Sequence, residues 1–279
     1  MKPTLVVISH YNAWATDQLI SLLDQMDAIP SGHPFRRRVV VNQAIPKPLQ
    51  LPDRFADVEV LYRENLGYNI GAWEEGWRCP SEADEFLFLQ EECQILSLGW
   101  LSAFHKQLNR AKVGLVGESL IWRGFRWSEV DGHDLSAYGI SVDRIFPSLF
   151  EEGRMLTLPQ GVLEVMNRRG IPAGASGEHL QSLILGSRRE VLEAAGGFIV
   201  GRSKAEANAA EVAISRAVAA KGYQVRQVAV RPFSYISHPQ WDGLRGGKLT
   251  WLRGCVDRYL PDPLANGLRK SMHRLKKWK

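Results

Sequence analysis

The chain has few cysteines and no long hydrophobic run. Its three cysteines, Cys79, Cys93 and Cys255, are scattered and odd in number, so they give neither a disulfide framework nor a zinc-ligand spacing. A reducing, cytosolic setting is therefore expected. No apolar run approaches the roughly 18–20 residues that span a bilayer. The apolar stretch at 5–8 is too short for a signal peptide and lacks a small-residue cleavage site, so it predicts a first strand.

An excess of basic charge is absent from most of the chain. The last fourteen residues, 266–279, hold six of the 35 Lys and Arg and no acid, which leaves 29 basic against 30 acidic side chains in the rest. A nucleic-acid-binding fold would carry a basic stripe on its own surface. The sequence therefore predicts no nucleic-acid partner. The first predicted strand is also not followed by Gly-x-Gly-x-x-Gly, which argues against a dinucleotide-binding dehydrogenase.

Strand and helix patterns alternate along the chain. Short β-branched or apolar runs predict strands, and apolar residues at helical spacing predict helices between them. This alternation predicts an α/β fold with a doubly wound, mostly parallel sheet that has helices on both faces. The strands are expected at 5–8, 39–41, 58–61, 85–89, 113–116 and 224–230, and the helices at 17–26, 74–78, 98–107, 187–195 and 205–221.

The composition, 45% apolar and 23% charged, is ordinary for one large globular domain with appendages. We expect this domain over 1–245, with an aromatic and charged insertion at about 121–177 that lines one side of a site or caps the sheet. The residues 246–279 form a basic helical tail in this interpretation. Its Leu268, Met272, Leu275 and Trp278 have helical spacing among basic residues. That pattern fits an amphipathic helix on an anionic membrane surface, or a solvated C-terminal helix.

Adjacent acids follow the apolar run 86–89, in the order Gln90, Glu91, Glu92. Ligands of open α/β sheets collect at the carboxyl ends of the strands. Carboxylates in such a crevice could hold a hard cation that in turn holds phosphate oxygens. Alternatively, the two glutamates begin a solvated turn.

The order of these motifs resembles the GT-A glycosyltransferases, most closely family 2, and in one segment the rhamnan-synthesis-type transferases. The likeness spans roughly residues 4–240. It rests on a first strand ending in Tyr-Asn, a second ending in Asn, an Asn-x-Gly turn with a further glycine, an acidic end after the apolar strand, an Arg-bearing helix with Gly-Gly-Phe and an acidic helix ending in Gly-Tyr. These segments are 5–12, 39–42, 64–73, 86–92, 188–198 and 211–223.

The resemblance implies a divalent cation, Mg²⁺ or Mn²⁺, that bridges the phosphates of a nucleotide-sugar. We nominate Glu92 first and Glu91 second as its ligands, with His238 completing the shell. Its alternative is an ordinary loop histidine. Gln90 stands where the family has the first Asp of its Asp-x-Asp motif. At this position the chain departs from the family, because one expected metal ligand is a neutral amide.

The resemblance also implies donor-binding and catalytic positions. The candidate donor contacts are Tyr11, Asn12, Asn42, Asn65, Gly67, Asn69, Gly71, Gln90, Arg188 and Arg189. The alternatives are a helix-starting loop for the first pair, an ordinary turn for the glycines and a solvated helix face for the arginines. Glu211 is the candidate general base, and Glu206 competes with it. Both could instead be acids favoured by the helix dipole.

The function implied by this resemblance is transfer of a sugar from a nucleotide-sugar to a saccharide or lipid-linked saccharide acceptor, in surface polysaccharide synthesis. We expect a cytoplasmic protein, peripheral on the inner face of the plasma membrane if the tail binds lipid. One alternative is a non-catalytic nucleotide- or sugar-binding protein that retains the fold. A second is a sugar-phosphate nucleotidylyltransferase, but these enzymes carry a Gly-rich basic loop where this chain has residues 9–14.

Overall fold

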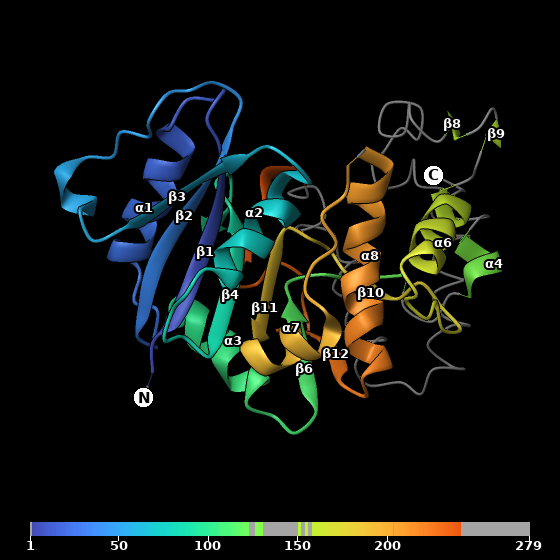
Figure 1. Cartoon of the computed structure of the whole chain (residues 1–279). Coiled ribbons are helices and arrows are strands. Elements are labelled where there is room, and N and C mark those ends of the chain that lie inside the picture. The colour runs from blue at the N-terminus through green and yellow to red at the C-terminus, as the bar shows by residue number, and fades with distance from the viewer. Residues whose placement is uncertain are drawn as a thin grey trace, which may run out of the picture.

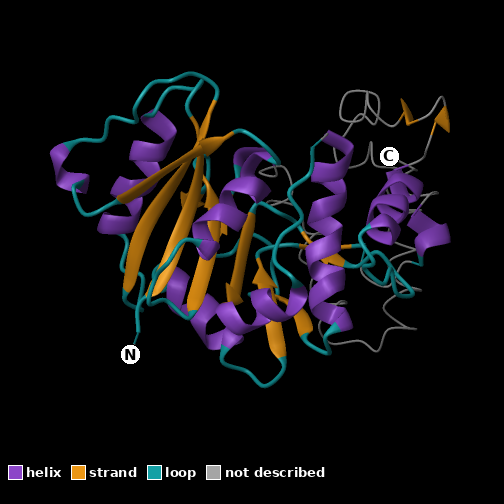
Figure 2. Cartoon of the chain, in the orientation of Figure 1, coloured by secondary structure: helices purple, strands orange, loops and turns teal. Residues whose placement is uncertain are grey.

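The computed structural model describes residues 2–122, 126–130, 150–151, 154–155, 158–202 and 204–240. The predicted tail helix at 246–279 lies outside these residues. Within them, a twisted sheet has helices on both faces, and a helical layer adjoins one end of it (Figures 1 and 2). No helix in this described part is both long and apolar enough to cross a membrane.

The main sheet has seven strands in the order β12-β6-β11-β4-β1-β2-β3. All neighbours pair in parallel except β11, which runs antiparallel between β4 and β6. The predicted mostly parallel sheet is confirmed, but β11 falls partly in a segment that the sequence assigned to a helix. The strands are β1 (Thr4–Tyr11), β2 (Phe35–Gln43), β3 (Glu59–Glu64), β4 (Glu85–Gln90), β6 (Val113–Gly117), β11 (Ile184–Arg188) and β12 (Gln224–Gln227).

Alternate residues of the central strands enter two separate cores, as expected for a sheet covered on both faces. Val6 and Ile8 pack with α1 (Asp17–Ala28) and α3 (Trp100–Leu108). Leu5 and Val7 pack on the other face with three helices: α2 (Tyr68–Arg78), α7 (Arg189–Ala195) and α8 (Lys204–Ala220). Each fully buried aliphatic side chain contributes about 1.5–3 kcal/mol of transfer free energy.

The insertion predicted at about 121–177 contains a helix, α6 (Leu158–Arg168), which packs against α8 (Figure 1). Val165 and Met166 of α6 meet Ala209 and Ala213 of α8 in a third small core. The described helix of this predicted insertion therefore extends the fold beside α8. The remaining short elements are η1 (Asp53–Phe55), β5 (Gln94–Ile95), β7 (Leu120–Ile121), α4 (Trp127–Val130), β8 (Phe150–Glu151), β9 (Arg154–Met155), β10 (His179–Leu180) and β13 (Ile236–Ser237).

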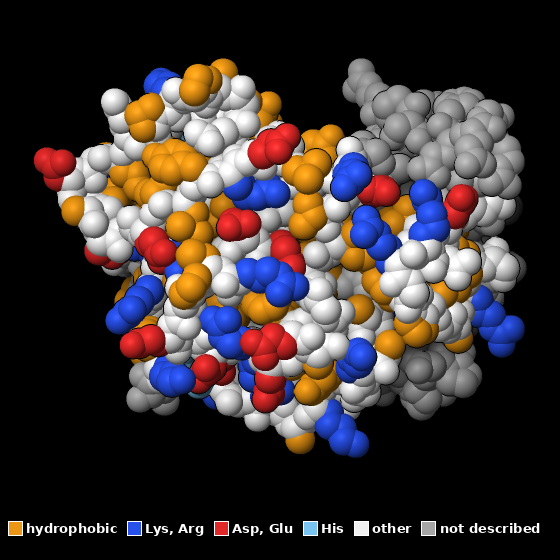
Figure 3. All heavy atoms as spheres, in the orientation of Figure 1, with side chains coloured by type: hydrophobic (Ala, Val, Ile, Leu, Met, Phe, Trp, Pro, Cys, Tyr) orange, Lys and Arg blue, Asp and Glu red, His pale blue; other side chains and the backbone are white. Residues whose placement is uncertain are grey.

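The sheet has two edges across its strands. We call the side where the parallel strands end the carboxyl edge; it includes Tyr11, Gln43 and Gln90. The side where they begin is the amino edge. Because β11 is antiparallel, it starts at the carboxyl edge beside Leu89 and finishes at the amino edge beside Glu85. On the face seen in Figure 3, acidic and basic side chains are interspersed.

Candidate active site

Glu91 is buried at the carboxyl edge between β4 and β1. Its Oε2 lies 2.5 Å from Nδ1 of His10, and its Oε1 accepts a hydrogen bond of 3.0 Å from the Tyr11 N–H. Both His10 and Glu91 are at most 2% exposed. The carboxylate predicted as second metal ligand therefore already has a partner for each oxygen, and it fixes the end of the first strand to the turn after the fourth.

Glu92 faces a different neighbour. Its Oε2 lies 3.8 Å from Nε2 of His238, which the sequence had nominated as its co-ligand. Burial alone would raise the pKa of Glu92, but the nearby His238 and the charge of His10 lower it. Glu92 is thus a carboxylate at neutral pH.

A third buried acid, Glu118, holds the loop that carries His238. Its two oxygens accept hydrogen bonds from the backbone N–H groups of Ser234, Tyr235 and Ile236, at 2.8, 3.1 and 2.8 Å. The following strand, β13, pairs with β5, just after Glu92. The sequence therefore folds so that two distant segments bring His238 and Glu92 together.

This pair fits a divalent cation. Nε2 of His238 is a buried nitrogen that has no hydrogen-bond partner among the described residues. Two ligands at about 2.0–2.2 Å from one ion stand about 3–4 Å apart, which the 3.8 Å separation matches. Nδ1 of His238 accepts a weak hydrogen bond of 3.3 Å from the Gln240 N–H. A histidine that binds a metal through Nε2 carries its proton on Nδ1, so this weak hydrogen bond would be lost on binding.

Gln90 is used within the protein. Its Nε2 donates a hydrogen bond of 3.0 Å to the carbonyl oxygen of Ser182, and Nδ2 of Asn69 donates to the same oxygen at 2.8 Å. The hydroxyl of Ser182 in turn donates to Oε2 of Glu211 at 2.6 Å. A short chain of contacts thus joins the end of β4 to the first turn of α2 and to α8.

Glu211 has the environment of a base. Its Oε1 lies 3.3 Å from Nε2 of His179, while Nδ1 of that histidine faces the Gly177 carbonyl oxygen at 2.7 Å. Burial would raise the pKa of Glu211, but the hydrogen bond and charge of His179, together with the Ser182 hydroxyl, lower it. The side chain is 27% exposed, and the lowered pKa keeps its carboxylate ionised at neutral pH.

Glu206, the competing acid, is tied to the chain that enters its helix. Its Oε2 accepts a hydrogen bond of 2.6 Å from the Arg202 N–H. This is the arrangement of an acid in the first turn of a helix that satisfies a free backbone donor. The structure therefore distinguishes the two acids, and Glu211 is the one connected to Gln90 through Ser182.

The predicted donor contacts at the ends of β1 and β2 are partly used by the fold. The side chain of Asn12 bonds the backbone of Ala44, Ile45 and Lys47 and so shapes the loop after β2. Asn42 donates to the Tyr68 carbonyl oxygen and accepts from the guanidinium of Arg63. The Tyr11 side chain remains partly exposed and meets Trp14 edge-on.

The turn before α2 lies at the same edge. Gly67 adopts φ +76°, and a Cβ there would come within 2.8 Å of Val200. A Cβ on Gly71 would lie 2.0 Å from the Leu66 carbonyl oxygen. Both glycines are therefore required by packing of the turn, whatever else approaches it. Asn65 lies in this turn, between β3 and α2.

Arg188 and Arg189, also predicted as donor contacts, lie at the other edge of the sheet. Because β11 is antiparallel, Arg188 pairs with Glu85 at the amino edge. The Arg189 guanidinium donates to the carbonyl oxygens of Ala83, Ser81 and Trp77. Four residues separate Glu85 from Gln90, about 17 Å along an extended strand, so neither arginine reaches the carboxyl edge.

Sequence reasoning missed four residues of this site: His10, Glu118, His179 and Ser182. His10 lies two residues after the apolar run 5–8, and the other three follow or precede short apolar runs. Their roles depend on contacts between segments 29 to 118 positions apart, which no local pattern encodes.

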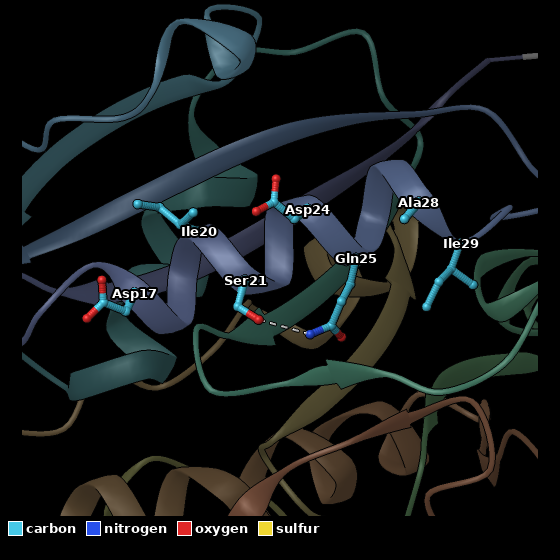
Figure 4. Close-up of a pocket in the computed structure, with 7 residues that line it drawn as sticks. All are labelled: Asp17, Ile20, Ser21, Asp24, Gln25, Ala28 and Ile29. Carbon is cyan, nitrogen blue, oxygen red and sulfur yellow. Dashed lines mark hydrogen bonds between the residues drawn. The ribbon is translucent and has the colours of Figure 1, made fainter.

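A hollow on the outer side of α1 is a separate feature. Figure 4 shows its lining residues, which all come from that helix and the Ile29 that follows it. Gln25 on this wall bonds Ser21, and Asp24 pairs with Arg54. The hollow gathers none of the strand-end residues described above.

No protein-family model matches the sequence, and neither does any curated protein. Among solved structures, the fold resembles the mannosyltransferase PcManGT from Pyrobaculum calidifontis in complex with GDP-Man and Mn²⁺, with a TM-score of 0.50 and 13% identity over 80% of this chain and 54% of that one. The S. aureus protein TarS, residues 1–349, aligns over 76% of this chain and 55% of its own at 13% identity, with a TM-score of 0.43 that carries no argument. The chain thus spans about half the length of these structures. At such identity the first likeness establishes the fold alone, and that fold is the GT-A-type α/β architecture that the sequence predicted.

Proposed function

We propose that this protein is a glycosyltransferase that moves a sugar from a nucleotide-sugar donor to a saccharide or lipid-linked saccharide acceptor. The observation that carries the proposal is the convergence of two ionised carboxylates at one edge of the sheet. Glu92 lies beside His238, and Glu211 is connected to the same strand end through Ser182 and Gln90. The solved mannosyltransferase of similar fold is in complex with GDP-Man and Mn²⁺, which supports a donor of this class.

Glu92 and His238 are the residues that would hold a divalent cation, Mg²⁺ or Mn²⁺. When bound, such an ion supplies charge neutralisation for the diphosphate leaving group. The protein's own contribution is to keep the Glu92 carboxylate charged and the His238 ring fixed by the loop that Glu118 anchors. We assign Glu91 the task of holding the β1 end, because both its oxygens have protein partners.

Glu211 is proposed to take the proton from the acceptor hydroxyl. The carboxylate is ionised, because its pKa is lowered, and it is partly open to solvent. Ser182 and His179 are positioning residues, since each bonds one carboxylate oxygen and thereby fixes the direction in which the remaining lone pairs point. Tyr11, Asn65 and Asn69 line the same edge and are proposed donor contacts.

The acceptor and the pathway are part of the same proposal. A saccharide on a lipid carrier, and a role in surface polysaccharide synthesis, follow from the family resemblance and from the basic spacing of residues 266–279. A peripheral position on the inner face of the plasma membrane is part of this proposal.

A second candidate is a nucleotide- or sugar-binding protein without catalysis. Two observations favour it: Gln90 is neutral and bonded to Ser182, and Glu91 is saturated, so the usual pair of metal carboxylates is reduced to one. In that case the edge would bind donors without breaking the sugar–phosphate bond.

The deciding experiment offers UDP-, GDP- and dTDP-sugars to the purified full chain, with and without Mn²⁺, and measures both binding and sugar release. A transferase releases nucleoside diphosphate from one donor, and Glu92→Gln lowers that rate at least about 100-fold. Binding without release in the wild type, on addition of saccharide acceptors, would favour the second candidate. Glu82→Gln, an acid outside the proposed site, is the matched control.

A further inference from the structure

A second group of histidine and carboxylate side chains lies at the amino edge, apart from the candidate active site. His33 comes from the loop between α1 and β2, Glu85 is the first residue of β4, and His105 lies in α3. One ligand atom from each of these three residues lies within 4.8 Å of the other two. Three segments far apart in the sequence therefore place two imidazoles and one carboxylate together.

The loop that carries His33 is fixed onto α3. The Gly99 N–H donates to the Pro30 carbonyl oxygen at 2.8 Å, and the Ser102 N–H donates to that of Ser31 at 3.0 Å. Gly32 has φ +71°, and a Cβ there would lie 2.9 Å from the Ser102 hydroxyl oxygen. This close approach, which only glycine permits, holds the next residue, His33, over the face of α3 one turn further on.

The His33 ring is buried beside a second histidine. It is 6% exposed and stacks on the His105 ring at a centroid distance of 3.9 Å. Within the described ranges, neither of its ring nitrogens has a hydrogen-bond partner. A neutral imidazole with a free lone pair is the form that binds a metal ion.

The other two side chains are already oriented toward each other. Nδ1 of His105 lies 2.8 Å from Oε2 of Glu85, and Nδ2 of Asn109 donates to Oε1 of the same carboxylate at 3.4 Å. An outer partner that orients a ligating carboxylate is a regular feature of metal sites.

We propose that His33, Glu85 and His105 bind one Zn²⁺ ion. Two imidazoles and a carboxylate are ligands that zinc accepts, with water in the fourth position. Tetrahedral ligands at about 2.0–2.1 Å from zinc stand about 3.4 Å apart, so modest side-chain rotations close the present spacing. The ion takes the place of the hydrogen bond between His105 and Glu85. It ties the α1–β2 loop and α3 to the start of β4, at the edge opposite Glu92.

The test uses Zn²⁺ alone and the full chain, first freed of metal with a chelator. Glu92→Gln/His238→Ala serves as the parent, so that the carboxyl edge contributes no zinc. Titration calorimetry and thermal unfolding are then compared in that parent and in versions that add His33→Gln, Glu85→Gln or Lys106→Ala. Lys106, exposed on α3 beside His105, is the matched control.

We expect saturating zinc to raise the Tm of the parent by roughly 5 °C, and the Lys106→Ala version to behave alike. His33→Gln and Glu85→Gln should each weaken zinc binding by about 100-fold and abolish the Tm shift. If one of the two fails to fold, the other decides. Equal zinc affinity in the parent and in the folded variants, or no zinc-dependent shift in the parent, would overturn the proposal. Neither readout requires transferase activity, so the result is independent of the proposed function.

Discussion

At the amino edge of the sheet, arginines hold backbone carbonyl groups, whereas at the carboxyl edge glutamates hold backbone N–H groups. Arg38 donates to the carbonyl oxygens of Gly76, Cys79 and Pro80, around the end of α2. Glu118 accepts three backbone N–H groups from the loop that precedes His238. At the amino edge this follows from the fold, because α2 ends there with free carbonyl groups, whereas the N–H groups that Glu118 accepts belong to the loop that leads into β13.

The two edges also differ in which charged side chains remain available after these hydrogen bonds to the backbone are made. At the amino edge, Arg38 and Arg189 are bonded to carbonyl oxygens and, for Arg38, to the Glu59 carboxylate. At the carboxyl edge, Glu92 and Glu211 keep side-chain exposures of 17% and 27%, and both have lowered pKa values. These two carboxylates are ionised and partly exposed, so they are available to a cation or a proton.

The largest effect should come from the proposed base. Glu211→Gln keeps the size of the side chain and a hydrogen-bond acceptor for Ser182, but it cannot take a proton. We expect kcat to fall about 10²–10⁴-fold with donor binding unchanged. Glu206→Gln, on the same helix, should change kcat by less than about threefold, since Glu206 bonds the Arg202 N–H. A similar loss in both variants would remove the distinction between them.

Next in size is the cost of removing the buried acid beside Glu92. Glu91→Ala leaves the His10 ring and the Tyr11 N–H without their buried acceptor. We expect the free energy of unfolding to fall by about 3–5 kcal/mol, measured by urea denaturation. Glu91→Gln retains an acceptor for Tyr11 and should cost less, and Glu92→Ala should cost about 1 kcal/mol or less. Loss of stability in Glu92→Ala equal to that in Glu91→Ala would contradict this division of roles.

The amino edge should respond in stability without a catalytic effect. Arg189→Met keeps an unbranched apolar side chain but removes the guanidinium, which lies over the Phe86 ring and donates to Ala83, Ser81 and Trp77. The orphaned carbonyl groups should lower the free energy of unfolding by about 1–3 kcal/mol. The kcat of the folded fraction should match that of the wild type. A rise in KM for the nucleotide-sugar alone would instead support the donor contact that the sequence predicted for Arg189.

The architecture could be predicted because its signals are local. The apolar runs 5–8, 39–41 and 85–89 all became strands, and the helix at 17–26 was correct within two residues. The strand β11 was missed because its residues, Ile184 to Arg188, adjoin a helix and pair antiparallel, which the parallel alternation does not anticipate. Because β11 runs antiparallel, Arg188 and Arg189 lie at the amino edge, away from the candidate active site.

The site was predictable only in part, for a similar reason. Adjacent acids after an apolar strand identify a strand end, but not which of Glu91 and Glu92 is consumed by the fold. That depends on His10, 81 residues away, and on His238, 146 positions beyond Glu92. A motif gives residue types in order, whereas the free lone pairs are known only once all partners are placed.

The smallest predicted effect is the most specific to the proposed base. His179→Ala removes the strongest of the interactions that lower the pKa of Glu211, so this pKa should rise. The acid limb of the kcat/KM profile should therefore move to higher pH, with a several-fold loss near pH 5–6 and little loss near pH 8. Ser182→Ala should move the limb in the same direction by less.

The lowered pKa of Glu211 should also make the free energy of unfolding depend on pH. A carboxyl whose pKa is lower in the folded than in the unfolded protein stabilises the fold above its unfolded pKa of about 4.3, and this contribution disappears as pH falls through the folded pKa. The wild type should therefore lose part of its advantage over His179→Ala as the solution is acidified below about pH 4.5. If His179→Ala instead lowered kcat/KM by the same factor at every pH, His179 would act by contacting substrate, and the carboxyl edge would contain a third reacting side chain rather than a positioned base.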